Sequence, residues 1–171
     1  MRRALPLAAP ALALAVPMLS LTACGLQPVY AGGSSGEVAR GLAAIDVPAI
    51  EGREGWLVRN ALHDRLQRAG DGGAAQYRLD VLLDDRLEGL GLLTDETIGR
   101  ERRTLRARYQ LVEIASGTIL LDATAGSDAG IDVVGSEYAT IAAEQTALEN
   151  LAQEVADQIV LRLTRTLREE R

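Results

Sequence analysis

A stretch near the C-terminus, residues 137–168, contains neither glycine nor proline and carries one continuous apolar stripe. The stripe residues recur every three or four positions, which is the spacing of an amphipathic α-helix; they are Leu148, Leu151, Val155, Ile159 and Leu163. Ser136 stands directly before the stretch and is predicted to be its N-cap. At 1.5 Å per residue the helix is about 50 Å long, so it can cross a whole β-sheet. The rest of the chain is therefore expected to supply a sheet with one apolar face.

Three upstream segments are predicted to be strands of that sheet. In 77–87 and 102–111 apolar and polar residues alternate, which is the period-two pattern of a half-buried strand. The pair Ser116-Gly117 predicts a short turn that joins 102–111 to a further strand at 118–125. These two strands are therefore expected to form a hairpin.

Two more elements precede those strands. Residues 41–50 are predicted to be a first strand that ends at Pro48, because proline cannot donate a ladder hydrogen bond. Residues 54–69 have apolar side chains at helical spacing and are predicted to form a helix that ends at Gly70. Residues 126–135, which are rich in glycine and aspartate, are predicted to be a connection. The order is β-α-β-β-β-α. The predicted fold class is α+β: a two-layer sandwich of about four mainly antiparallel strands, covered on one face by two helices.

Residues 1–23 have the arrangement of a secretory signal peptide. Arg2 and Arg3 precede an uncharged apolar stretch, 4–19, whose prolines make a membrane-spanning helix the poorer interpretation. The segment ends in Leu21-Thr22-Ala23-Cys24, which resembles the lipobox of bacterial lipoproteins, where the cysteine is acylated and becomes the first residue. The alternative for Cys24 is a small buried apolar side chain.

These features divide the chain into three parts. Residues 1–23 are the predicted lipoprotein signal peptide, 24–40 are a lipidated N-terminus with a flexible tether, and 41–171 are a single α+β domain. A glycine- and serine-rich run at 32–36 supports the tether. A lipoprotein carries more than one acyl chain, which is enough for stable anchoring to a membrane.

Composition excludes much of enzyme chemistry. The chain has 1 His and 1 Cys, so it can form neither a His/Cys metal cage nor an internal disulfide, and no metal or cofactor is expected. His63 beside Asp64 could be a general base, but nothing else in the sequence completes a dyad. A solvent-facing position on the helix is the favoured interpretation of His63. The net charge of -6 argues against nucleic-acid binding through bulk charge.

Other candidate motifs are weak. The neighbours Asp84 and Asp85 would point to opposite faces of a strand, and the pair Glu169-Glu170 lies at the terminus, so both pairs are interpreted as solvated charge. Gly89-Leu90-Gly91 lacks the lysine and hydroxyl residues of a phosphate loop. We therefore predict that the protein is not an enzyme.

The strongest positive signal is a row of arginines on one predicted strand. Strand alternation places the row on the face opposite Leu105, Tyr109 and Leu111; its members are Arg100, Arg102, Arg106 and Arg108. Guanidinium groups about 7 Å apart can grip phosphates or carboxylates bidentately. Alternatively, the row is a solvated face that pairs across strands with Asp80 and Asp84. The residues alone leave both interpretations open.

Several segments of the chain together resemble the alphaproteobacterial branch of the LptE family of lipopolysaccharide-assembly lipoproteins. They are Cys24-Gly25-Leu26-Gln27-Pro28-Val29-Tyr30-Ala31, Ala107-x-Tyr109-x-Leu111, Ser116-Gly117-Thr118-Ile119-Leu120 and Ser136-Glu137-Tyr138-Ala139-Thr140-Ile141-Ala142-Ala143-Glu144. The start at Cys24 and the entry to the last helix are the most specific parts. One departure is Leu26, where many members have Phe.

The resemblance implies a two-helix, four-stranded domain, lipid-anchored to the outer membrane on its periplasmic side. It implies a plug and assembly partner of the LptD β-barrel that takes part in lipopolysaccharide transport to the cell surface. The anionic part of lipopolysaccharide would then be a ligand for the row Arg100, Arg102, Arg106 and Arg108. Two alternatives are that the protein is an auxiliary periplasmic lipoprotein of an inner-membrane lipid (ABC) transporter, or that it is a periplasmic hydrolase. The hydrolase is disfavoured because the sequence contains no nucleophile–base pair.

Overall fold

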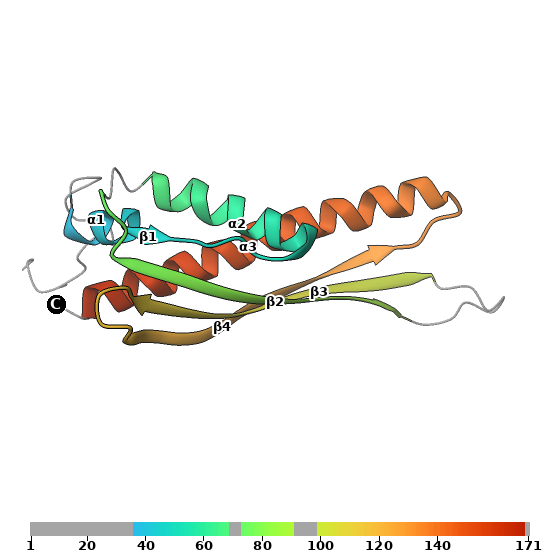
Figure 1. Cartoon of the computed structure of the whole chain (residues 1–171). Coiled ribbons are helices and arrows are strands. Elements are labelled where there is room, and N and C mark those ends of the chain that lie inside the picture. The colour runs from blue at the N-terminus through green and yellow to red at the C-terminus, as the bar shows by residue number, and fades with distance from the viewer. Residues whose placement is uncertain (1–35, 69–72, 91–98, 170–171) are drawn as a thin grey trace, which may run out of the picture.

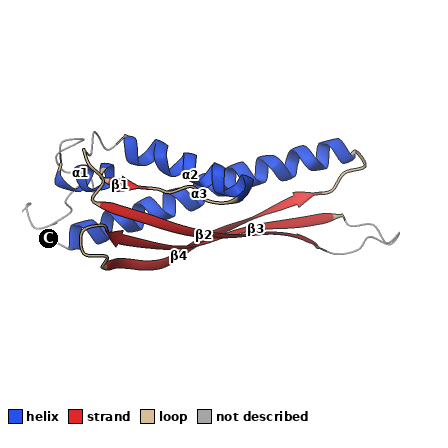
Figure 2. Cartoon of the chain, in the orientation of Figure 1, coloured by secondary structure: helices blue, strands red, loops and turns tan. Residues whose placement is uncertain are grey.

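The computed structural model describes residues 36–68, 73–90 and 99–169. In chain order the elements are α1 (Glu37–Ala43), β1 (Ile45–Asp46), α2 (Gly52–Gln67), β2 (Tyr77–Gly89), β3 (Arg100–Glu113), β4 (Ile119–Asp132) and α3 (Glu137–Glu169). The helices lie on one side of the sheet, and α3 runs along its length (Figures 1 and 2). The α+β class and the helix layer over one sheet face confirm the predicted fold.

The sheet has four strands in the order β1-β2-β3-β4. β1 pairs in parallel with β2, whereas β2–β3 and β3–β4 are antiparallel, as predicted for most of the sheet. Gly117 occupies the left-handed region with φ 70 in the turn between β3 and β4, a conformation that glycine adopts without steric cost. β4 is the last strand in this order and therefore forms one edge of the sheet.

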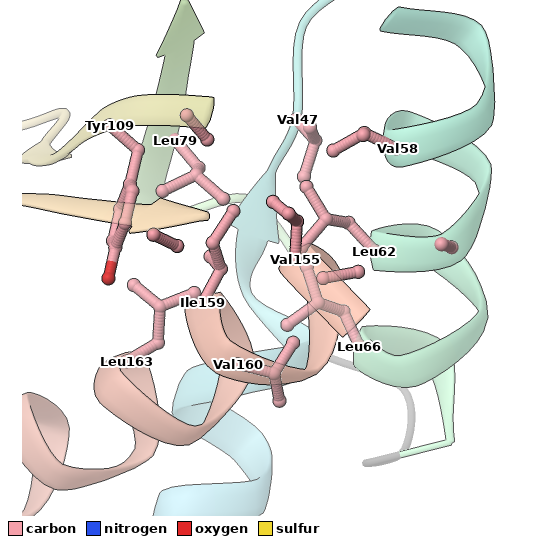
Figure 3. Close-up of a cluster of buried hydrophobic side chains, with 14 of the residues drawn as sticks. Val47, Val58, Leu62, Leu66, Leu79, Tyr109, Val155, Ile159, Val160 and Leu163 are labelled. Carbon is pink, nitrogen blue, oxygen red and sulfur yellow. The ribbon is translucent and has the colours of Figure 1, made fainter. Parts of the chain in front are cut away.

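The core lies between the sheet and α3. The predicted stripe of α3 is buried at Leu148, Leu151, Val155, Ile159 and Leu163. α3 packs on β3 and β4, and α2 packs mainly against α3 through residues such as Val58 and Leu62. Figure 3 shows Leu62, Leu66, Val155 and Ile159 in this cluster, with Leu79 and Tyr109 contributed by the sheet. The amphipathic periodicity thus identified the layer contacts correctly.

Residues 37–50 differ from the prediction. A tether was expected up to residue 40 and a strand from 41, but α1 spans Glu37–Ala43 and β1 is only Ile45–Asp46. Ala39 and Leu42 are buried, so α1 is held by packing against the rest of the domain, chiefly α3. This packing outweighs the modest intrinsic stability of a single short helix. Residues 24–35 of the predicted tether lie outside the described residues.

The second difference is the length of β4. The prediction ended this strand at residue 125 and placed a connection at 126–135, whereas β4 continues to Asp132. Along the added part, Gly126 pairs with Arg106 and Gly130 with Arg102. Pairing with a neighbouring strand satisfies the backbone, which outweighs the low strand propensity of glycine and aspartate. The hairpin is consequently long enough to reach the N-terminal end of α3.

Candidate functional site

The candidate site is the outer face of the sheet, on the side away from the helices. β3 exposes Arg100, Arg102, Arg106 and Arg108 on this face, as strand alternation predicted. The alternate residues of the same strand face the helices and are buried, among them Leu105 and Tyr109. The structure therefore brings the predicted arginine row together on one accessible surface.

Most of the row is paired with aspartates of β4. Arg100 Nε lies 3.2 Å from Asp132 Oδ1, and Arg102 Nε lies 3.8 Å from Asp128 Oδ2. Arg108 donates from Nη2 to Asp122 Oδ2 at 2.9 Å. The hydrogen bond from Arg108 is the largest cause that lowers the pKa of Asp122 below its usual value, and Gln110 adds a second one.

The alternative partners on β2 are not used. Asp80 pairs with Arg78 of its own strand at 2.9 Å, and Asp84 pairs with Arg86 at 2.9 Å. The alternative interpretation of the row as a solvated face named Asp80 and Asp84 as its partners, but the aspartates that pair with the row belong to β4. Exposed pairs of this kind contribute little free energy, so they leave the guanidinium groups available to a stronger anionic ligand.

Arg106 differs from the rest of the row. Its partner across β4 is Gly126, which has no side chain, and its partner across β2 is Asp84, which binds Arg86. Within the described residues Arg106 makes no ion pair. A Cβ built on Gly126 would lie 3.2 Å from Arg106 Cδ, so the arginine side chain lies against the glycine. Arg106 is therefore the member of the row whose charge is least compensated.

On the face of the sheet that packs against the helices, the structure contains an ion pair that the sequence did not lead us to predict. Arg103 donates to both carboxylate oxygens of Asp85, from Nε at 3.0 Å and from Nη2 at 2.5 Å, and Nη1 donates to the Glu144 carbonyl oxygen at 3.0 Å. The two side chains are only 16% and 15% exposed. The hydrogen bond to Asp85 is the largest cause that raises the pKa of Arg103. The contact joins β2, β3 and α3.

The interpretation of Asp85 as solvated charge is therefore wrong, although it holds for Asp84, which is exposed. The signal was present in the sequence, because Asp85 and Arg103 share the parity of their strands' apolar residues. The solvent-facing assignment of His63 is also wrong: the residue is half-buried, and its Nε2 is buried without a hydrogen-bond partner. Glu169 is exposed, while Glu170, Gly91 and Cys24 lie outside the described residues.

No group of His, Cys, Asp or Glu within residues 36–68, 73–90 and 99–169 could hold a metal ion. No helix in the same ranges is long and apolar enough to cross a membrane. A long helix on a charged four-stranded sheet defines the class of protein, a two-layer α+β module that presents polar faces.

The chain belongs to the LptE family. The family model, described as lipopolysaccharide-assembly, matches residues 42–163. The family consists of non-enzymatic lipoproteins, so this chain is a lipoprotein of the cell envelope with a role in lipopolysaccharide assembly, and it is not an enzyme. The resemblance drawn from the sequence is confirmed.

Solved structures agree with this assignment. A protein from Caulobacter crescentus CB15 that is described as a lipoprotein is 28% identical, with a TM-score of 0.66, and the match covers 80% of this chain and 98% of that one. The minor lipoprotein of Acinetobacter baumannii is 17% identical, with a TM-score of 0.53 over 70% of this chain and 87% of its own.

Rare lipoprotein B of Shewanella oneidensis is 14% identical, with a TM-score of 0.53 over 74% of this chain and 97% of its own. At these identities the Acinetobacter and Shewanella structures show the fold alone. A comparison with the curated proteins finds no match.

Proposed function

We propose that acylated Cys24 anchors this protein to the periplasmic side of the outer membrane, where it plugs an LptD-type β-barrel and assists the barrel's assembly. The observation that carries the proposal is the family match over 42–163. The charged outer face of the sheet supports it, because the interior wall of a large membrane barrel is polar. A plug that meets this wall needs a large and mostly polar interface.

The partner is tested by affinity purification from detergent-solubilised outer membranes, followed by mass spectrometry. The expected result is a single large β-barrel recovered in stoichiometric amount. Recovery of inner-membrane transporter subunits instead would favour the auxiliary-lipoprotein function. Depletion of this protein should lower the amount of folded barrel before other outer-membrane proteins change, and a barrel that folds normally under depletion would contradict the assembly role.

The anchor is tested separately. Cys24→Ala should abolish incorporation of labelled fatty acid and release the protein from membranes on flotation, because no other cysteine is present to accept the acyl chain. A Cys24→Ala variant that still takes up label would exclude this anchor. Because the anchor and the barrel interaction are measured independently, loss of one does not hide the other.

The arginine row is proposed as a contact for the anionic part of lipopolysaccharide, with Arg106 at its centre. Support comes from the shared exposed face of the row and from the uncompensated charge of Arg106. The matched control is Arg78→Glu, since Arg78 is exposed on the same face of the sheet but belongs to β2 and is paired within its own strand. Replacement of row members by Glu should reduce lipopolysaccharide binding, whereas Arg78→Glu should leave it unchanged.

A further inference from the structure

α3 and the edge strand β4 enclose an open groove of about 470 Å³. Its floor is formed by Tyr109 of β3 with Ala123 and Ala125 of β4, and its helix side carries Leu161, Arg162 and Arg165. The groove is closed on one side by Gln158, whose side chain accepts from the Gly126 N–H and donates to the Gly126 carbonyl, each at 3.2 Å. The groove lies between α3 and the edge of the sheet, and its Asp122 is hydrogen-bonded to Arg108 of the arginine row.

The cationic groups of this groove are uncompensated. Arg162 and Arg165 are three positions apart on α3, so their side chains extend from the same face of the helix. Both are exposed, and in the described part of the chain neither makes an ion pair or a hydrogen bond. Asp122 also lines the groove, but its carboxylate is held by Arg108 and by Gln110 at 2.8 Å. The groove is a locally positive site on a chain of net charge -6.

Tyr109 adds a hydrogen-bond donor beside these charges. The residue is 2% exposed, and Figure 3 shows its ring beside Leu163 with the oxygen on the side of α3. Burial raises the pKa of the Tyr109 hydroxyl, and Arg162 acts in the opposite direction, which places the guanidinium within electrostatic reach of the phenol. The hydroxyl stays protonated at neutral pH and can donate to an anion held by the arginines.

An apolar surface adjoins the charges. Leu161 is 47% exposed, although most large apolar side chains of α3 are buried. Together with Ala123 and Ala125 it offers hydrocarbon contact next to the guanidinium groups. A free inorganic anion would use the arginines alone, whereas an amphiphile uses both surfaces. This combination favours a lipid whose head group carries a phosphate.

The groove lies at the end of the molecule that carries α1, the first described element (Figure 1). Arg162 and Arg165 belong to the C-terminal part of α3, which lies at the same end as α1 (Figure 1). Residues 24–36 can span at most about 45 Å between the proposed anchor and α1. The anchor would therefore keep the groove near a membrane surface, where phosphorylated amphiphiles are concentrated.

We propose that this groove binds the phosphate of an anionic amphiphile, with Arg162 and Arg165 gripping the phosphate oxygens, Tyr109 donating its hydroxyl hydrogen and Leu161 contacting hydrocarbon. Planar guanidinium groups suit tetrahedral phosphate because they donate in bidentate geometry. The inference rests on the proposed function in lipopolysaccharide assembly, and it names a second contact whose guanidinium groups come from α3 and not from the row on β3.

The test uses the full chain in neutral detergent and phosphatidylcholine vesicles that contain either diphosphorylated or dephosphorylated lipid A. Wild-type protein should bind the phosphorylated vesicles, and Arg162→Gln/Arg165→Gln should bind about tenfold more weakly. Tyr109→Phe should lose about threefold, because only one hydrogen bond is removed. The control Arg78→Gln/Arg86→Gln removes the same number of exposed guanidinium groups from β2 and should bind as wild type.

Any of three outcomes would overturn the inference. The first is equal binding by wild type and Arg162→Gln/Arg165→Gln, and the second is equal binding of wild type to phosphorylated and dephosphorylated vesicles. The third is that inorganic phosphate, at matched ionic strength, displaces the protein from the vesicles as efficiently as the lipid does. Thermal melting of each variant shows that the fold is kept. Barrel capture by the same variants separates the two proposals. Retained capture with weaker lipid binding supports the groove, whereas a wild-type protein that captures no barrel contradicts the proposed function whatever the groove does.

Discussion

The adjacent residues Asp84 and Asp85 offer a sharp test of how the sheet distributes charge between its two faces. Asp85→Ala removes the partner of Arg103 and leaves a guanidinium whose side chain is only 16% exposed. Breaking a buried ion pair in this way typically costs about 3–5 kcal/mol, because the remaining charge is no longer compensated. Since this pair retains some exposure, we expect a loss near the lower end, about 3 kcal/mol.

Asp84→Ala is the matched control. It removes the same chemical group one residue away, but its partner Arg86 has a side chain that is 65% exposed. Exposed pairs contribute up to about 1 kcal/mol, so this variant should stay close to wild type. At about 3 °C per kcal/mol for a domain of this size, the two variants should differ in Tm by several degrees.

The measurement is urea unfolding followed by circular dichroism, with thermal melting as a second readout. A double variant, Asp85→Leu/Arg103→Met, should recover most of the lost free energy of unfolding, because apolar side chains of similar volume avoid the desolvation cost. Equal destabilisation by Asp84→Ala and Asp85→Ala would refute the assignment of the two carboxylates to opposite faces. So would a double variant as unstable as Asp85→Ala alone.

Three further predictions concern the core, the arginine row and the buried tyrosine. Leu151→Ala and Ile159→Ala should each lower the free energy of unfolding by about 2–5 kcal/mol in urea titrations, and wild-type stability would show that the stripe of α3 faces no core. Arg106→Glu/Arg108→Glu should weaken lipopolysaccharide binding in a salt-dependent way and leave the circular dichroism spectrum unchanged, and replacement of the same residues by Lys should weaken binding less. Equal binding by wild type and the double Glu variant across a salt series would show that the row is a solvated face. Because burial raises the pKa of Tyr109 in the folded state, its contribution to stability should be complete below about pH 10 and lost at higher pH. Tyr109→Phe should flatten that alkaline decline in urea unfolding, and an unchanged decline would contradict the burial of the hydroxyl.

The sequence by itself determined the elements whose periodicity is local. α3, β2 and β3 follow from apolar spacings of three to four or of two, because a helix or a strand must place one regular set of side chains against the core. The family resemblance was likewise carried by short segments, among them the one from Ser136 to Glu144, and the family match confirms it. The exposed face of the arginine row followed from the same alternation.

The tertiary structure decided what depends on neighbours. β4 extends over Gly126 and Gly130 because β3 supplies hydrogen-bond partners there, and the spacing of apolar residues within 126–132 does not indicate this pairing. Strand order and register, in turn, gave the arginine row aspartates of β4 as partners and left Arg106 opposite a glycine. The groove beside Arg162 exists only where α3 crosses the edge of β4. Local spacing specifies which way a side chain points, but the atoms it meets are set by elements distant in the chain, whose positions depend on packing of the whole domain.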